Sequence, residues 1–504
     1  MDTGNNQSGS TGNGMSTAGT AAHPEKHSGF SSKLGFVMAA AGSAVGLGNI
    51  WRFPYLSAKY GGGIFLLTYF ILVLTFGYAL LISENCLGRL TGKGPIGTYN
   101  HFCKGKKGFL GFVRFGGWIN SIVPMIIVPY YCVIGGWVTK YVFAMLCNPV
   151  GVFAKTNLVE TGALNADGTA QTMPYAVKYF TNFIGSTWEP IFFFLLFGGI
   201  MTAVVAFGVE KGIERFNKVA MPVLLVLIIG ICIKCFTLPN SGEGFAYYLK
   251  PDFSKFSYMT VVAAMGQLFF SLSIAMGIMI TYGSYMRKED NLISSVNHVE
   301  LWDTAVAFLA GLMIIPAVVS FGGKEAAEAA GPGLVFITMP QVFASFATGG
   351  RVIGVMFFLL VLFAAATSAV SLLETNVQSV AQEFKLNRKG SIIFGMIEVI
   401  AVGIITILGY SVFKNFHPLA FIERYQGFDI LDTLDFVSNN FLMPLAAIFT
   451  TILVVAVIGL EKFTKEIKSG APRWYRQWIY ELCMCVIVIP CLLVILLNSL
   501  GIIK

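Results

Sequence analysis

Long apolar segments dominate this chain, and each has about the length that a helix needs to cross a bilayer. A spanning helix takes about 20 residues, and backbone groups in lipid must find their hydrogen-bond partners within the protein. The sequence therefore predicts an all-α polytopic membrane protein with eleven transmembrane helices. The predicted spans lie near residues 34–57, 63–90, 110–146, 188–208, 214–236, 257–286, 294–322, 351–384, 390–412, 432–459 and 475–502.

The composition agrees with this class. Hydrophobic residues make up 55% of the 504 residues and charged residues only 12%, whereas soluble domains carry about 25% charged residues. The net charge of +8 does not indicate nucleic-acid binding, because excess Lys and Arg in such a protein gathers in cytoplasmic loops. We expect a lipid bilayer as the surroundings and no nucleic-acid partner.

The distribution of basic residues predicts the orientation. Clusters such as "CKGKKG" and "MRKED" follow even-numbered spans, and basic loops favour the cytoplasmic side. The N-terminus is then cytoplasmic, and eleven spans place the C-terminal Lys504 outside the cell. Residues 1–32, rich in Gly, Ser, Thr and Asn, predict a disordered cytoplasmic tail. A single multi-pass domain in the cell membrane follows over residues 33–504.

Two of the predicted spans are interrupted at matching positions. Span one breaks at "SAVGLGN" (43–49) and span six at "SLSIAMG" (271–277), five helices apart. Such a pair indicates a transporter with two inverted repeats and a site at mid-membrane. Free N–H groups at a break favour an anion, and free carbonyls favour a small cation. The alternative is that these glycines serve close helix packing. The predicted repeats are 33–237 and 255–460, and the eleventh helix, 474–504, lies outside them.

Several segments resemble one known family. The stretches "AGSAVGLGNIWRFPY", "GQLFFSLSIAMGIMITYGSYMRK", "AAATSAVSLLE" and "LDTLDF" are similar to the first, sixth, eighth and tenth helices of the neurotransmitter:sodium symporter family, which has the LeuT fold. The resemblance covers nearly the whole chain after residue 33. It implies a LeuT-type 5+5 inverted repeat with broken helices one and six. It also implies Na⁺-coupled import of amino acids or their derivatives by alternating access.

The resemblance implies two sodium ions held by oxygen ligands. For the segment "ATS" (366–368) taken alone, the alternative is that its hydroxyls form hydrogen bonds with carbonyls of their own helix. The ligands of the first ion would be the Ala44 carbonyl, the Asn49 side chain, Ser271, Asp303 and the substrate carboxylate. The ligands of the second would be the carbonyls of Gly42, Val45 and Ala364 and the hydroxyls of Thr367 and Ser368.

Gating and supporting roles also come from the resemblance. Arg52 and Asp435 match the outer gate pair, and Tyr131 and Phe270 complete the expected gate. Glu84 would satisfy backbone groups of the broken sixth helix. Further positions concern the cytoplasmic side: Tyr285 would brace the sixth helix, and Gly212 and Pro222 match a Gly-x₉-Pro spacing that unwinds the inner end of helix five in bacterial members. The alternative for this spacing is chance.

The substrate is expected to be a hydrophobic α-amino acid. Amine-transporting relatives have an aspartate where this chain has Gly46, so Gly46 leaves room for the substrate's own carboxylate, beside Gly48 and Tyr131. The predicted pocket is almost wholly apolar, which favours a bulky aliphatic or aromatic side chain. Its full set is Ala44, Gly46, Gly48, Ile127, Tyr131, Phe270, Ser271, Ser273, Ile274, Ala275, Met276, Ala369 and Leu372.

Departures from the family pattern predict chloride-independent transport. Tyr69, Gln267 and Ser271 match residues that bind chloride in relatives, but the remaining serine is Ala307. Asp303 stands where an asparagine is usual, and its carboxylate can supply the charge that chloride would bring. An alternative role for Asp303 is proton antiport.

The inner gate also differs from the family pattern. The family has an Arg–Asp pair at this place, whereas this chain has His27 and Gln382, with Lys26 and Glu383 adjacent. Which of these residues close the inner mouth stays open. The lack of a twelfth helix leaves the oligomeric state open, with a homodimer as one alternative.

Other functional classes fit less well. A channel requires polar rings along a pore, and a sensor usually carries a soluble output domain. An enzyme is the weakest alternative, since no nucleotide motif, metal cluster or nucleophile–base set is found in the sequence.

Overall fold

The computed structural model describes residues 29–164, 170–329, 332–346, 349–471 and 473–503. Its elements are labelled α for helices, β for strands and η for 3₁₀ or π turns. The first five predicted spans and their connections comprise α1 (Lys33–Ala44), η1 (Gly48–Arg52), α2 (Phe53–Lys59), α3 (Gly63–Leu72), η2 (Val73–Gly77), α4 (Tyr78–Thr91), α5 (Pro95–Cys103), α6 (Gly108–Phe112), α7 (Phe115–Cys147), η3 (Val150–Phe153), β1 (Leu158–Leu164), β2 (Ala170–Pro174), α8 (Tyr175–Gly185), α9 (Trp188–Ala206), η4 (Val209–Glu214) and α10 (Arg215–Phe236).

The following elements form the second set of spans and the last helix. They are α11 (Ser241–Leu249), η5 (Phe253–Lys255), α12 (Tyr258–Ser271), α13 (Ile278–Ser284), α14 (Leu292–Ala329), η6 (Pro332–Leu334), α15 (Thr338–Ala344), α16 (Gly350–Phe384), α17 (Arg388–Leu408), η7 (Glu423–Tyr425), α18 (Ile430–Asp435), η8 (Phe436–Leu442), α19 (Met443–Ile452), η9 (Leu453–Gly459), α20 (Leu460–Ile467), α21 (Gln477–Leu482), η10 (Cys483–Ile487) and α22 (Val488–Ser499).

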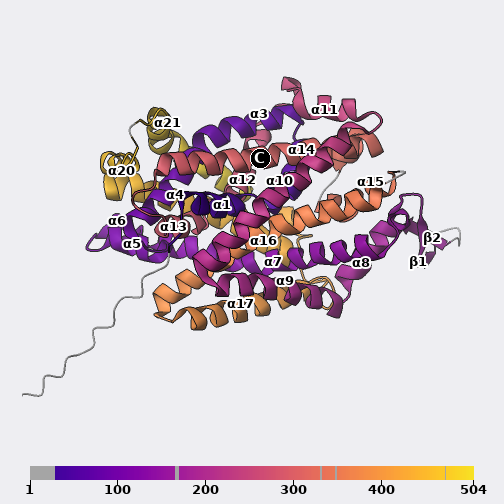
Figure 1. Ribbon diagram of the computed structural model, residues 1–504, viewed down its shortest axis with the longest axis horizontal. Coiled ribbons are helices and arrows are strands. Elements are labelled where there is room, and N and C mark those ends of the chain that lie inside the picture. The colour runs from indigo at the N-terminus through magenta and orange to yellow at the C-terminus, as the bar shows by residue number, and fades with distance from the viewer. Residues whose placement is uncertain (1–28, 165–169, 330–331, 347–348, 472, 504) are drawn as a thin grey trace, which may run out of the picture.

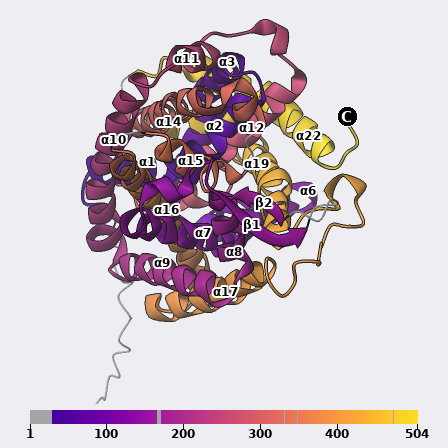
Figure 2. The same cartoon turned by 90° about the vertical axis from the view of Figure 1, so that its right-hand side faces the viewer.

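The long helices lie side by side in one bundle. Figure 1 shows α5 and α20 near one end of this bundle, and α11, α15 and the strands near the other end. Figure 2 looks along the bundle, where α9, α10 and α17 lie outside α16 and α7. Every residue of α1 from Gly35 to Ala44 is buried. The first broken helix therefore lies inside the bundle, surrounded by protein.

The number of spans depends on how broken helices are counted. By length and hydropathy, the described residues contain nine helices able to cross a membrane, or ten when Lys33–Ala44 and Gly48–Lys59, bent by 45°, form one span. The predicted span 257–286 consists of α12 and α13, and each half is too short to count by itself. The all-helical membrane class is confirmed, but this measure does not reach the predicted count of eleven.

The beginning of the described chain packs against the sixth span. Residues 1–28 of the expected tail, 1–32, lie outside the described residues. Phe30 is only 3% exposed, and its N–H donates to the Tyr285 carbonyl at 3.2 Å. The four residues 29–32 thus form part of the packed structure.

Span one is interrupted because Val45 leaves the helical conformation, with φ −76° and ψ 94°. The Asn49 side chain accepts a hydrogen bond from the Gly46 N–H at 3.0 Å. An unpaired backbone group in lipid costs several kcal/mol, so this side chain stabilises the break.

Span six is interrupted between α12 and α13. Ser273, Ala275 and Gly277 there have φ values of 53°, 61° and 72°, which are uncommon for residues other than glycine. The fully buried Glu84 accepts a hydrogen bond from the Ala275 N–H at 2.7 Å. Glu84 therefore satisfies a backbone donor that the break leaves without a helical partner.

Two features of the fold were not predicted in this form. The loop after α7 contains an antiparallel hairpin in which Leu158 of β1 faces Pro174 of β2. Arg476, just before α21, donates to both carboxylate oxygens of Glu300 on α14, at 2.6 and 2.7 Å. Its guanidinium carbon also lies 3.5 Å from the centroid of the Tyr78 ring. The last helix is therefore tied to α14 and α4 by one arginine.

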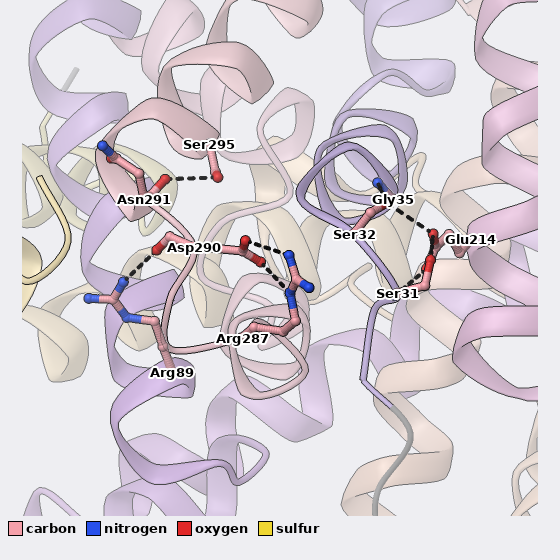
Figure 3. A network of polar contacts seen from close by, with 9 residues as sticks. All are labelled: Ser31, Ser32, Gly35, Arg89, Glu214, Arg287, Asp290, Asn291 and Ser295. Atoms are coloured by element: carbon pink, nitrogen blue, oxygen red, sulfur yellow. Dashed lines mark hydrogen bonds and ion pairs between the residues drawn. The ribbon is translucent and has the colours of Figure 1, made fainter.

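Glu214 ties the start of α1 to α10, and Figure 3 shows the contact. The Ser31 hydroxyl and N–H donate to its two carboxylate oxygens at 2.5 and 2.8 Å, and Lys218 forms an ion pair with it at 2.6 Å. On the left of Figure 3, Arg287 pairs with Asp290 at 2.9 Å. This hydrogen-bonded carboxylate raises the pKa of the Arg287 guanidinium above its ordinary value.

Candidate functional site

The two helix breaks enclose a small cavity. It is almost closed in this conformation, with a volume of about 10 Å³, far below the 300–1,000 Å³ typical of sites for drug-sized ligands. None of the described residues that line it is acidic or basic. It is lined by Ser43, Ala44, Gly46, Gly48, Ile127, Tyr131, Phe270, Ser273, Met276, Ser368 and Leu372.

Most of the pocket residues expected from the sequence line this cavity, but four do not. Ser271, Ile274, Ala275 and Ala369 are buried without lining it. Sequence reasoning missed Ser43 as a lining residue. Its carbonyl accepts hydrogen bonds from the Ser273 and Ser368 hydroxyls, both at 2.9 Å. The only signal for Ser43 was its place directly after Gly42 at the start of the break.

The two glycines of the first break lie against neighbouring side chains. A Cβ at Gly46 would collide with the Ser368 hydroxyl and lie 3.0 Å from the Tyr131 hydroxyl. A Cβ at Gly48 would lie 2.6 Å from Cδ1 of Phe270. The Tyr131 hydroxyl also accepts a hydrogen bond from the Leu47 N–H at 3.2 Å. Both positions therefore require glycine in this conformation.

A first cluster of polar side chains lies beside the cavity. The Asn49 amide donates to Asp303 Oδ1 at 2.7 Å and to the Ser271 hydroxyl at 3.1 Å. The Ser271 hydroxyl donates to the same carboxylate at 2.8 Å, and Tyr69 donates to Ser271 at 3.0 Å. All four residues are fully buried. Their oxygens are hard ligands of the kind that alkali and alkaline-earth cations prefer.

A second cluster joins the first break to α16. The Thr367 hydroxyl lies 3.3 Å from the Val45 carbonyl and 3.1 Å from the Ala364 carbonyl. The Ser368 hydroxyl turns instead toward the Ser43 carbonyl. Three of the five oxygens predicted for the second ion are thus together. Gly42 faces Thr367, because a Cβ at Gly42 would lie 3.4 Å from Thr367 Cβ.

A larger cavity lies beyond Phe270 and Tyr131, which line both cavities. Its volume is about 290 Å³, and Arg52 and Asp435 both line it. Among the described residues, no ion pair joins these two charges. Instead the Arg52 guanidinium lies 5.6 Å from the Phe270 ring centroid, and Asp435 accepts from Asn439 at 2.5 Å. Arg52 and Asp435 thus line the same cavity without contacting each other.

Comparison with known proteins identifies this architecture. A family model described as the sodium:neurotransmitter symporter family matches residues 27–503. The chain belongs to this family. It is similar to a solved structure of MhsT in complex with L-phenylalanine, with a TM-score of 0.80 and 32% identity, covering 94% of this chain and 99% of that one. This neighbour shows the LeuT-type arrangement.

Curated relatives agree. An uncharacterized sodium-dependent transporter, YhdH, of Bacillus subtilis is 33% identical over 94% of this chain and 98% of that protein. The sodium-dependent transporter MJ1319 of Methanocaldococcus jannaschii is 31% identical over 89% of this chain and 86% of that protein. The human sodium- and chloride-dependent GABA transporter 2 is 25% identical over 89% of this chain and 76% of that protein. This symporter is therefore a membrane transporter of a small molecule that uses Na⁺, and it is not an enzyme.

At the opposite end from the large cavity, the symporter has a buried ion pair that sequence reasoning missed. The Glu374 carboxylate, fully buried on α16, accepts from Arg388 at 2.6 Å and from the Tyr285 hydroxyl at 2.8 Å. Arg388 also donates to the Val205 carbonyl at 2.7 Å. These contacts join the sixth, eighth, ninth and fourth spans. The signal was a glutamate inside an otherwise apolar span.

Of the four residues expected near the inner gate, His27 and Lys26 lie outside the described residues. Gln382 accepts from the Gly94 N–H at 3.0 Å, and Glu383 lies beside it near the end of α16. Gly212 lies in the π turn η4, and Pro222 lies inside α10. The described conformation is therefore wound across the Gly-x₉-Pro segment.

We expect Arg388→Gln to destabilise the symporter more than the double variant Arg388→Gln/Glu374→Gln. The single change leaves a buried carboxylate without its counter-charge, which costs about 3–5 kcal/mol in fully buried pairs and less here because Arg388 is partly exposed. Thermal unfolding of the four proteins in detergent gives the coupling energy, expected at about 0.5–3 kcal/mol. Additive effects would show that the pair does not hold these spans together.

Proposed function

We propose that this symporter imports a hydrophobic α-amino acid together with two Na⁺ ions and without chloride. The observation that carries the proposal is the cavity at the two breaks, whose lining combines glycines and hydroxyl groups with apolar side chains. Such a site fits a molecule that has both a carboxylate and an apolar side chain.

The substrate carboxylate would bind beside Gly46. The Tyr131 hydroxyl, which accepts from the Leu47 N–H, would donate its own hydrogen there, and the positive end of a half-helix favours an anion. No acidic residue lines the described cavity, so an amine without a carboxylate would lack a counter-charge. Ile127, Met276 and Leu372 line the apolar part. The neighbour crystallised with L-phenylalanine supports this substrate class.

The two clusters would each hold one Na⁺. Asn49, Ser271, Asp303 and the Ala44 carbonyl would form the first site with the substrate carboxylate. The second site would consist of the Thr367 and Ser368 hydroxyls and the carbonyls of Gly42, Val45 and Ala364. An ion bound there would coordinate carbonyl oxygens that the helix break leaves without N–H donors. These residues would hold both ions and substrate while the protein alternates between openings to the two sides.

Chloride independence would follow from Asp303. Its carboxylate is hydrogen-bonded by Ser271, whose hydroxyl also accepts from Tyr69. These two hydroxyls match positions that bind chloride in relatives. A fixed negative charge at this place makes a bound anion unnecessary, and it would repel one.

The cytoplasmic side would be the end at which α5 and α20 lie. Basic residues such as those of 103–108, between α5 and α6, would make that side cytoplasmic by the positive-inside rule. The large cavity with Arg52 and Asp435 would then open outward. Arg52 and Asp435 would approach each other when the outer path closes over the substrate, with Phe270 and Tyr131 beneath them.

Uptake into proteoliposomes tests the function. We expect an inward Na⁺ gradient to drive uptake of L-phenylalanine and L-leucine, and replacement of Na⁺ by choline to abolish it. Replacement of chloride by gluconate should leave the rate unchanged. Ser368→Ala should weaken the dependence on Na⁺. Uptake that ignores Na⁺, or a panel of amino acids of which none is transported, would contradict the proposal.

A further inference from the structure

Asn217 places an unpaired amide oxygen at the interface between α10 and α1. The side chain is fully buried, and its Nδ2 donates to the Ile213 carbonyl at 2.9 Å. Because a carbonyl can only accept, the NH₂ group must face Ile213, and Oδ1 must face the other way. Among the described residues, no donor reaches this Oδ1. A buried acceptor without a partner is costly, so this oxygen is available to accept a contact from a water or a cation.

This oxygen faces the second polar cluster. A Cβ at Gly42 would collide with Asn217 Oδ1, and the same Cβ would lie 3.4 Å from Thr367 Cβ. The Thr367 hydroxyl lies 3.1 Å from the Ala364 carbonyl and 3.3 Å from the Val45 carbonyl. Asn217 Oδ1 is therefore next to the oxygens assigned to the second ion, on the side from which α10 approaches.

The contact of α1 with the start of α10 extends along two turns of α1 and about one turn at the junction of η4 and α10. Glu214 lies against Gly35, where a Cβ would collide with its carboxylate, and Asn217 lies in the same way against Gly42. The two glycines are seven residues apart and the two polar residues three apart, so each pair lies on one helix face. This row runs from the start of α1 at Ser31 to the break, and Asn217 stands at its inner end.

We propose that Asn217 Oδ1 is a further ligand of the second Na⁺, on the cytoplasmic side of its site. The inference rests on the proposed function, because it requires that Na⁺ binds between the first break and α16. An amide oxygen is a hard neutral ligand, which suits an alkali cation. It would give the ion a contact with α10 in addition to its contacts with the first break and α16.

The position of Asn217 connects the ligand to ion release. It lies midway between Gly212 and Pro222, in a segment that begins with the π turn Val209–Glu214 and contains a proline without an N–H. Both features weaken the helical hydrogen-bond ladder. Unwinding of this segment would withdraw Oδ1 from the ion and at the same time admit water. Na⁺ would then leave toward the cytoplasm with one ligand fewer.

A Na⁺ titration without transport tests this assignment. The purified full chain in detergent, without amino acid, is heated at increasing NaCl with choline chloride keeping the ionic strength constant. Ligand binding stabilises the folded state by RT ln(1 + c/Kd), where c is the free ligand concentration, so a fit of the unfolding midpoint against the Na⁺ concentration gives an apparent Kd, the half-saturating Na⁺ concentration. We expect Asn217→Leu to raise this concentration about tenfold, in the range found for lost outer ligands of metal sites. Asn217→Asp, which keeps the oxygen and adds charge, should not raise it.

Asn85→Leu is the matched control. Asn85 is also buried, with Nδ2 donating to the carbonyl four residues before it at 2.8 Å and Oδ1 without a partner, but it lies on α4. We expect it to leave Na⁺ half-saturation unchanged. Combining Asn217→Leu with Thr367→Ala should give less than the product of their single effects, because both act on one ion. Combining it with Asn49→Ala should give the full product.

The outcomes separate the two claims. A wild type whose midpoint ignores Na⁺ overturns the proposed function. A wild type that responds, with Asn217→Leu equal to wild type, overturns only the role of Asn217, and water then satisfies its oxygen. If Asn217→Leu does not fold, Asn217→Ala replaces it, and an unchanged half-saturation in that variant also overturns the assignment.

Discussion

Replacing Asp303 by Asn should abolish amino-acid uptake in chloride-free buffer, and adding Ala307→Ser should restore uptake only when chloride is present. Under the proposed function, the Asp303 carboxylate of the wild type would supply the negative charge beside the first Na⁺. A buried ion without an opposite charge costs about 3–5 kcal/mol, so we expect the single variant to lose about 100-fold or more in uptake. The double variant returns the serine that completes the anion site with Tyr69 and Ser271.

The measurement compares four proteins in proteoliposomes with chloride or gluconate. Ala307→Ser alone is the control, since it keeps Asp303 and should remain indifferent to chloride. In the Asp303→Asn variant the amide oxygen can still accept from Asn49, but an NH₂ group replaces the oxygen that accepts from Tyr69 at 3.4 Å, so thermal unfolding in detergent must show that the variant still folds. A chloride-dependent wild type, or a double variant that stays inactive in chloride although it is folded, would contradict the role given to Asp303.

Gly46→Ala should reduce uptake by about tenfold or more, and Gly46→Asp should abolish it for every α-amino acid. The new Cβ would collide with the Ser368 hydroxyl and crowd Tyr131, and overpacking of a filled interior costs about 1–3 kcal/mol. In addition, the aspartate would place its carboxylate where the substrate carboxylate binds, so two like charges would meet. We expect the loss to appear mainly as a higher KM in the alanine variant.

Gly266→Ala is the matched control for this prediction. Gly266 lies in α12, and a Cβ there would meet no atom within 4 Å. The control should therefore transport at the wild-type rate. Gly46→Ala with an unchanged KM would mean that the substrate carboxylate does not lie beside this residue.

Much of the architecture could be predicted from the sequence, because the bilayer reduces the choices. Apolar segments of fixed length must be helices, and the paired breaks at Gly46 and near Gly277 show as small and polar residues inside two such segments. The oxygen clusters could be named only through the family resemblance, since hydroxyls in a membrane helix by themselves favour bonding to their own backbone. Indeed Thr367 also bonds back to the Phe363 carbonyl, at 3.1 Å.

Other features depend on contacts between helices, which a local sequence pattern does not predict. The partners Glu374 and Arg388 belong to different helices, and their contact depends on how α16 and α17 turn toward each other. Asn217 resembles any polar residue on a helix until Gly42 is seen to face it. The π turns, such as η8 and η9 within the tenth span, insert an extra residue into a turn and rotate the following face. A prediction that assumes a regular helical period therefore assigns the wrong residues to the buried face of such a span.

The tie between Arg476 and Glu300 has a consequence for how the chain is made. The two residues are 176 positions apart. Because synthesis adds about 5–20 residues per second, Arg476 is translated roughly 10–35 s after Glu300. During that time the carboxylate of the seventh span must stay near water at the membrane surface or remain protonated. The neutralising charge is therefore translated long after the carboxylate. A chain halted before Arg476 would contain a seventh helix whose Glu300 carboxylate has no counter-charge, and this would oppose insertion of that helix into the membrane.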